Sequence, residues 1–176
     1  MAGSEMPVGI DRSRHQGLMG RDRHVWWRRG ALVLVAALPI LGLLNVFGQH
    51  TAPRTYQGSA ASLTIDSPAR VRGGLIFTTE IAIVPDRQLK DARLYLDSGW
   101  FNGMTFNGVA PQPSNESAQG RWMVWDYGAL PAASGFRLWI SWQTNPTNIG
   151  RHSQNVELYD GGTQLMTAHR TITVFP

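Results

Sequence analysis

The feature that most constrains this chain is an apolar run from Ala31 to Gly48 that contains no charged residue. Its eighteen residues approach the length that an α-helix needs to cross a bilayer core of roughly 30 Å. Trp26 and Trp27 precede the run, and amphipathic rings of this kind favour the headgroup level of a membrane. The sequence therefore predicts a transmembrane helix over residues 26–48.

The run allows two other interpretations, a core helix and a cleaved secretory signal. A core helix would show polar positions on one face, whereas Asn45 is the one strongly polar residue here. A cleaved secretory signal has an apolar region of about 7–15 residues and a small-x-small cleavage site. Residues 31–44 are short enough for such a signal, but thirty residues precede them and no good cleavage pair follows. An uncleaved anchor is favoured, and cleavage stays open as the alternative.

The charge distribution predicts the orientation of this anchor. Residues 1–30 hold six arginines and three acids, whereas Arg54 is the one basic residue close behind the run. Because basic flanks stay cytoplasmic, we expect a single-pass plasma-membrane protein with its C-terminal domain outside. Residues 61–176 hold nine basic and nine acidic residues. The high pI therefore belongs to the tail, and the composition does not favour a nucleic-acid partner.

Features within and around the span suggest further interactions. Pro39, Gly42 and Asn45 mark places where a partner helix is expected to pack, because a proline frees a backbone carbonyl that needs a new partner in lipid. A tolerated kink is the plainer interpretation of Pro39. Residues 1–25 are polar without an apolar period, which predicts a disordered basic tail. Residues 49–60 are expected to form a short flexible stalk.

From residue 61 onward the hydrophobic period is two. Apolar and polar side chains alternate in residues 75–84, 92–97 and 136–142, as in strands that bury one face. Turn residues separate these runs at short intervals. We predict a mainly β fold, in which residues 61–176 form an immunoglobulin-like Greek-key β-sandwich of seven to eight strands with no further helix.

One of these turns allows two interpretations. Asp160-Gly161-Gly162 is typical of a β-hairpin, which would join residues 155–159 to residues 164–175. The same residues faintly resemble a calcium-binding turn, but the alternating acidic ligands of such a loop are missing. The hairpin is therefore the favoured prediction.

The C-terminal run from Gly135 to Pro176 resembles the last three strands of bacterial cell-surface sandwich repeats, which end in a Thr-x-Thr-Val sequence, here Thr171 to Val174. Residues 30–176 are similar to uncharacterised actinobacterial membrane proteins with one N-terminal span and one such domain. The more distinctive pieces of this resemblance are residues 100–104 and 111–114. The resemblance implies an immunoglobulin-like domain of a cell envelope and supplies no catalytic residues.

The composition and motifs disfavour an enzyme. The chain has no cysteine, which excludes disulfides, thiol catalysis and thiolate metal sites. No nucleophile elbow, phosphate-binding loop or metalloprotease motif is present. A zinc cluster of His152, His169 and Glu157 is conceivable where strands pair, but solvent-facing histidines are the favoured interpretation. We expect no cofactor, no metal site and no enzymatic activity.

Aromatic side chains are the most function-like feature of the predicted domain. The alternation assigns Trp142 to the core and Trp139 to the opposite face. Trp100 and Phe101 lie beside an Asn-Gly turn, where exposure is expected. Exposed aromatics supply large rigid contact areas. The residues assigned to an interaction surface are Trp100, Phe101, Trp125 and Trp139.

These features favour a non-enzymatic, membrane-anchored protein. Its partners are then the bilayer and a second protein of the envelope or of a membrane complex, bound by the sandwich domain. The alternative is a module that binds an envelope glycan through Trp100, Phe101 and Trp139. Nothing in the sequence distinguishes the identity of such a partner.

Overall fold

The computed structural model describes residues 21–44 and 50–176. The chain divides into two compact units, residues 1–48 and 49–176, and each is described by itself. The expected tail is tested only from residue 21 onward, because residues 1–20 lie outside the described residues.

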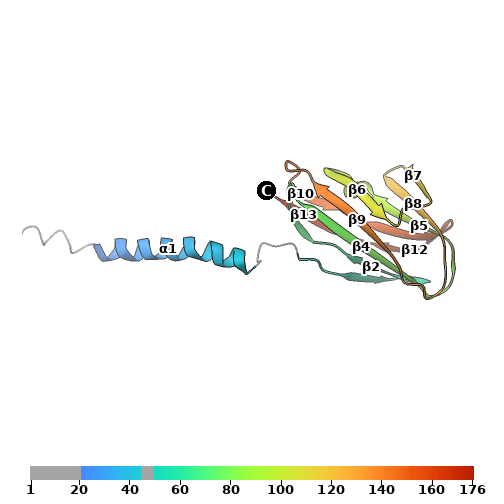
Figure 1. Cartoon of the computed structure of the whole chain (residues 1–176), viewed down its shortest axis with the longest axis horizontal. Coiled ribbons are helices and arrows are strands. Elements are labelled where there is room, and N and C mark those ends of the chain that lie inside the picture. Colours follow the sequence, from blue (N-terminus) through green and yellow to red (C-terminus); the bar gives the residue numbers. More distant parts are fainter. Residues whose placement is uncertain (1–20, 45–49) are drawn as a thin grey trace, which may run out of the picture. The chain divides into compact units, whose positions relative to one another are not determined.

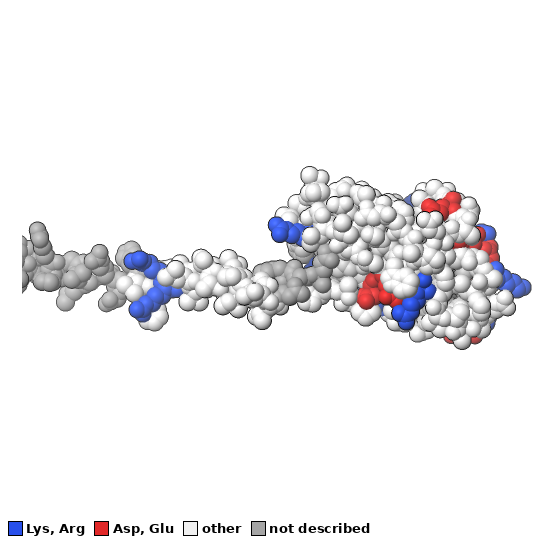
Figure 2. All heavy atoms as spheres, viewed as in Figure 1, with Lys and Arg blue, Asp and Glu red and all other residues white. Residues whose placement is uncertain are grey.

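Among its described residues, the first unit contains one helix, α1 (Arg21–Leu43). Its stretch from Val25 to Leu43 is long and apolar enough to cross a membrane, and none of it is buried. A core helix would be buried, so this exposure disfavours that alternative. Among the described side chains of α1, basic atoms lie at one end and the remaining surface carries no charge (Figure 2).

The start of α1 corrects the predicted extent of the tail. The helix begins at Arg21 and not at residue 26, so residues 21–25 belong to the helix and not to a disordered tail. Pro39 and Gly42 lie inside α1, whereas Asn45 lies outside the described residues. A partner helix at these positions stays a prediction.

The second unit consists of strands and one short 3₁₀-helix, η2 (Ser98–Trp100) (Figure 1). The strands are β1 (Arg54–Gln57), β2 (Ala61–Asp66), β3 (Arg70–Arg72), β4 (Ile76–Pro85), β5 (Leu89–Asp97), β6 (Met104–Ala110), β7 (Asn115–Gln119), β8 (Trp122–Leu130), β9 (Phe136–Thr144), β10 (Gly150–Ser153), β11 (Val156–Asp160), β12 (Thr163–Ala168) and β13 (Thr171–Phe175).

These strands form two five-stranded sheets and a smaller one. The front sheet has the order β1-β2-β4-β9-β6, and the back sheet has the order β12-β11-β5-β8-β7. The small sheet has the order β10-β13-β3, in which β13 and β3 run parallel. The predicted mainly β class is confirmed, with one N-terminal apolar helix and an immunoglobulin-like sandwich.

The period of two explains which side chains fill the core. In β4, Phe77, Ile81 and Ile83 are buried together with Thr79, whose hydroxyl donates to Ser67 Oγ at 2.8 Å. In β5 and β9 the inward positions predicted from the alternation are likewise buried, except for the half-buried Phe136 at the start of β9. Burial of each large apolar side chain stabilises the fold by about 1.5–3 kcal/mol relative to exposure. This inner layer joins the front and back sheets.

The strand count and the stalk differ from the sequence prediction. The described residues contain thirteen strands, not seven or eight, because several short polar strands such as β1, β7 and β10 carry no apolar alternation. The stalk prediction is wrong for residues 54–57. They form β1, which pairs with β2 over four residues from Arg54↔Ile65 to Gln57↔Ser62.

Two glycines provide a test of the close packing around η2. A Cβ atom on Gly99 would lie 2.1 Å from the backbone oxygen of Ser153, whereas one on Gly162 would meet nothing within 4 Å. We expect Gly99→Ala to lower the free energy of unfolding by about 1–3 kcal/mol, as in overpacked cores. Gly162→Ala should change it by less than about 1 kcal/mol. Urea unfolding of both variants measures the difference, and equal stabilities would contradict the described contact.

Candidate interaction surface

The outer face of the front sheet contains the exposed aromatic residue that the sequence predicted. Trp139 stands on β9 with 45 % of its surface exposed. Its cross-strand neighbours are Glu80 on β4 and Ala110 on β6. Because β9 lies between β4 and β6, the indole is positioned by strands on both sides. The position of Trp139 thus agrees with the alternation of β9.

An ion pair lies beside this indole on the same face. Arg137 Nη1 donates to Glu80 Oε1 at 2.8 Å, and Arg137 occupies the position on β9 two residues before Trp139. A large part of the Arg137 side chain is exposed, so the pair contributes little to folding. The side of the sandwich seen in Figure 2 carries few charges, and a group of acidic and basic atoms lies side by side on it.

Two of the residues assigned to the interaction surface are buried, so that part of the prediction is wrong. Trp100 ends η2 with 0 % of its surface exposed, and its Nε1 donates to the backbone oxygen of Asn155 at 3.1 Å. The Asp97 carboxylate caps η2 by accepting from the Gly99 N–H, which turns the next side chain inward. Trp125 on β8 is 1 % exposed.

These rings form an aromatic cluster between the sheets, made of Trp100, Phe101, Phe106, Trp125 and Trp142. The ring of Trp142 stacks on Trp100 at a centroid distance of 5.6 Å and meets Phe101 edge-on at 5.3 Å. Phe106 lies 5.8 Å from Trp125. Phe101 is only half-buried but packs against the core. Trp100 is therefore not accessible to a glycan. Of the three aromatic residues proposed for glycan binding, only Trp139 is well exposed.

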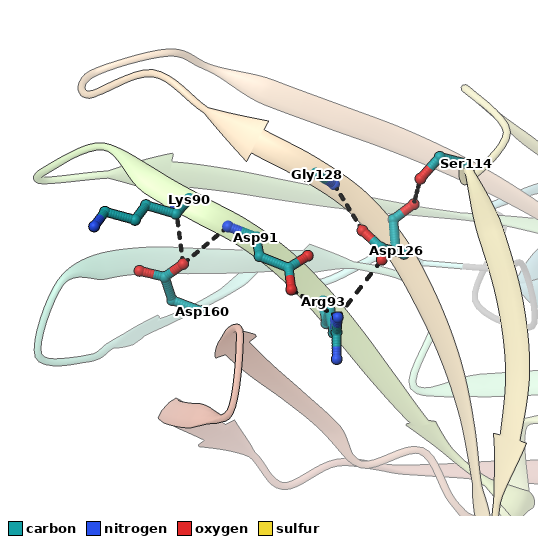
Figure 3. Close-up of polar contacts among 7 residues, drawn as sticks. All are labelled: Lys90, Asp91, Arg93, Ser114, Asp126, Gly128 and Asp160. Carbon is teal, nitrogen blue, oxygen red and sulfur yellow. Dashed lines mark hydrogen bonds and ion pairs between the residues drawn. The ribbon is translucent and has the colours of Figure 1, made fainter.

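The hairpin prediction at residues 160–162 is confirmed. β11 and β12 pair across this turn, with Asp160 opposite Thr163. The Asp160 carboxylate accepts from the backbone N–H groups of Lys90 and Asp91 at 2.8 and 3.0 Å (Figure 3). This carboxylate therefore links the hairpin to β5 by hydrogen bonds. These bonds give Asp160 a structural role that needs no calcium ion.

Two further acids, Asp91 and Asp126 in the back sheet, also have partners within the domain. Arg93 contacts Asp91 at 2.7 Å and Asp126 at 3.7 Å, and the Asp126 carboxylate accepts from the Gly128 N–H at 2.9 Å (Figure 3). Across residues 21–44 and 50–176, no group of three histidine or acidic side chains is arranged to hold a metal ion. The zinc cluster considered from the sequence is therefore not formed by these residues.

A basic pocket in the second unit was missed by the sequence analysis. It has a volume of about 420 Å³ and is lined by residues of β1, β3, β10 and β13 and of the segments next to them. No period or motif marks it, because its residues come from distant parts of the chain. Its basic residues are Arg54, Arg70, Arg151, His169 and Arg170.

Comparisons with known proteins give no family. No protein-family model and no curated protein matches the sequence. Solved structures with similar topology include a non-cellulosomal cohesin from Archaeoglobus fulgidus, with 16 % identity, a TM-score of 0.41 and coverage of 65 % of this chain and 91 % of that one. A CARDB domain from Pyrococcus furiosus has 14 % identity, a TM-score of 0.42 and coverage of 69 % and 97 %. The sulfur carrier protein SoxY from Chlorobium limicola has 14 % identity, a TM-score of 0.41 and coverage of 69 % and 84 %.

The different burial of two tryptophans leads to a stability test. We expect Trp100→Ala to lower the free energy of unfolding by about 3–5 kcal/mol, because it leaves a cavity against Trp142. The matched variant Trp139→Ala should cost less than about 1 kcal/mol, since it truncates a side chain on the surface. Chemical denaturation followed by circular dichroism measures both. A similar loss in the two variants would show that the indole of Trp139 supports the fold.

Proposed function

We propose that this chain is a non-enzymatic, membrane-anchored binding protein whose sandwich domain binds another protein of the cell envelope or of a membrane complex. The observation that carries this proposal is the outer face of the front sheet, where an exposed indole stands beside a surface ion pair. We assign the interaction surface to Trp139, Glu80, Arg137 and Ala110 on three adjacent strands.

The chemistry of this surface suits a protein partner. Tryptophan and arginine are the residues most enriched at the energetic centres of protein interfaces, because they supply large contact areas and several hydrogen-bond donors. A tryptophan side chain has only two rotatable bonds, so ordering Trp139 in an interface would cost little side-chain entropy. The Glu80–Arg137 pair offers both charge signs next to the indole, and such pairs select the orientation of a partner.

The anchor part of the proposal rests on α1. The apolar stretch of this helix meets the length and composition of a membrane span, and the arginines at positions 28 and 29 lie at its N-terminal side. By the positive-inside rule, the N-terminus is cytoplasmic and the sandwich is extracytoplasmic. The actinobacterial membrane proteins that the chain resembles have this arrangement, and the preference for arginine over lysine, fifteen to one, agrees with such a host.

Membrane fractionation with mass spectrometry tests the anchor. We expect the protein to stay in the membrane pellet after an alkaline carbonate wash and to retain residues 1–48, because an uncleaved span is held by its apolar surface. A protease added outside spheroplasts should digest the sandwich domain and leave the tail. A soluble protein that begins after residue 44 would show that the segment is a cleaved signal.

Quantitative co-purification from mild detergent tests the surface. Trp139→Ala should weaken the complex with the native partner by about 30-fold or more, as expected for truncation of a tryptophan at an interface centre. Phe175→Ala is the matched control, because Phe175 is 46 % exposed but lies on β13 of the small sheet. Retention of the partner by the Trp139 variant, or equal loss in both, would contradict the assignment of this face.

A further inference from the structure

The register of the small sheet places two arginines on either side of a threonine. Thr173 on β13 lies opposite Arg151 on β10 and opposite Arg70 on β3. Residues paired in this way point to the same face of a sheet, with neighbouring Cβ atoms about 5 Å apart. Two exposed arginines therefore flank Thr173 on one face of the small sheet, and all three residues line the basic pocket.

Arg170 supplies a buried cation to the same pocket. Only 6 % of its surface is exposed, and its Nη2 donates to the backbone oxygens of Ser67 and Pro68. Its Nη1 is buried and has no hydrogen-bond partner among the described residues. The pKa of Arg170 is lowered to about 10, chiefly by burial; Tyr56 and Asp66 oppose this lowering, and the charge of Arg54 adds to it. At neutral pH the guanidinium is therefore charged.

The arginines of this pocket form no ion pair with an acid among the described residues, although the Asp66 carboxylate acts on Arg170 from beyond ion-pair distance. Arg93, Arg121 and Arg137 lie within 4.0 Å of carboxylates, but among the described residues none of the four arginines of the pocket does. No aspartate or glutamate lines the pocket. The domain is neutral over residues 61–176, so this pocket concentrates positive charge that is compensated elsewhere in the sandwich. Such a concentration of cations attracts an anion.

We propose that the basic pocket binds a phosphate group, as a phosphomonoester or phosphodiester. Planar guanidinium groups donate paired hydrogen bonds to phosphate oxygens. Thr171, Thr173 and Asn155 also line the pocket and add neutral residues with hydrogen-bonding side chains. A volume of about 420 Å³ exceeds that of a bare phosphate ion and leaves room for the glycerol or sugar that carries it. The site is lined by the small sheet and by β1 at the edge of the front sheet, and it shares no residue with the proposed protein-binding face.

Calorimetric titration of the full chain in non-ionic detergent tests the site with sn-glycerol 1-phosphate and with short-chain phosphatidylglycerol. We expect saturable binding of one phosphate ligand that weakens as salt is added. Arg70→Gln with Arg151→Gln should weaken it by about tenfold or more, because two charge-assisted hydrogen-bonding groups are lost. Both arginines are exposed, so this double variant keeps the core intact.

The control double variant is Arg72→Gln with Arg87→Gln, which removes the same charge from exposed residues outside the pocket. It should bind as the unchanged protein does, and so should Trp139→Ala. Tighter binding of phosphatidylglycerol than of glycerol phosphate would identify a lipid headgroup as the source, and equal binding would identify a soluble phosphate ester; either result supports the site. The proposal is overturned by absence of binding, by equal weakening in the control, or by citrate binding as tightly as glycerol phosphate.

Discussion

The packing of Trp142 between the two large sheets is the contact on which the rest of the sandwich depends. The indole comes from β9, the strand at the interior of the front sheet, and touches rings from η2 and β6. Dispersion and apolar burial at this point are large because the rings meet at near-contact distances. The same strand places Trp139 on the opposite face. The core packing of β9 therefore fixes the position of the exposed indole that we assign to partner binding.

The strands with one buried face were predictable, because their apolar and polar side chains alternate in the sequence. The alternation in residues 75–84 and 136–142 predicts β4 and β9. The same alternation predicts that Trp139 lies on the outer face of its strand. The short strand β1 was not predictable. Its residues, Arg-Thr-Tyr-Gln, show no apolar alternation, and only pairing with β2 makes them a strand.

The candidate sites were harder to predict from the sequence than the fold was. The Asn-Gly turn after Trp100 suggested exposure, but the capping of η2 by Asp97 rotates the indole into the core. Trp125 lacks a clear period because its neighbour Val124 is buried as well. The basic pocket depends on lateral register between β10, β13 and β3, and residues 70, 151 and 170 carry no local pattern that brings them together. The direction of a side chain along a strand follows from the local sequence. The register between strands depends on residues that are far apart in the chain.

Because β13 pairs with β3, cleavage of β13 would affect the basic pocket more directly than the face that carries Trp139. β13 lies between β10 and β3, so the strand over residues 171–175 joins an early part of the domain to a late one. Proteolytic trimming of this strand would separate Arg70 from Arg151 and disperse the cationic pocket. It would remove no strand of the front sheet, whose members all lie before residue 145. Trimming would therefore act directly on the cationic pocket, and it would reach the face that carries Trp139 only through the loss of the buried side chains of Ile172 and Val174.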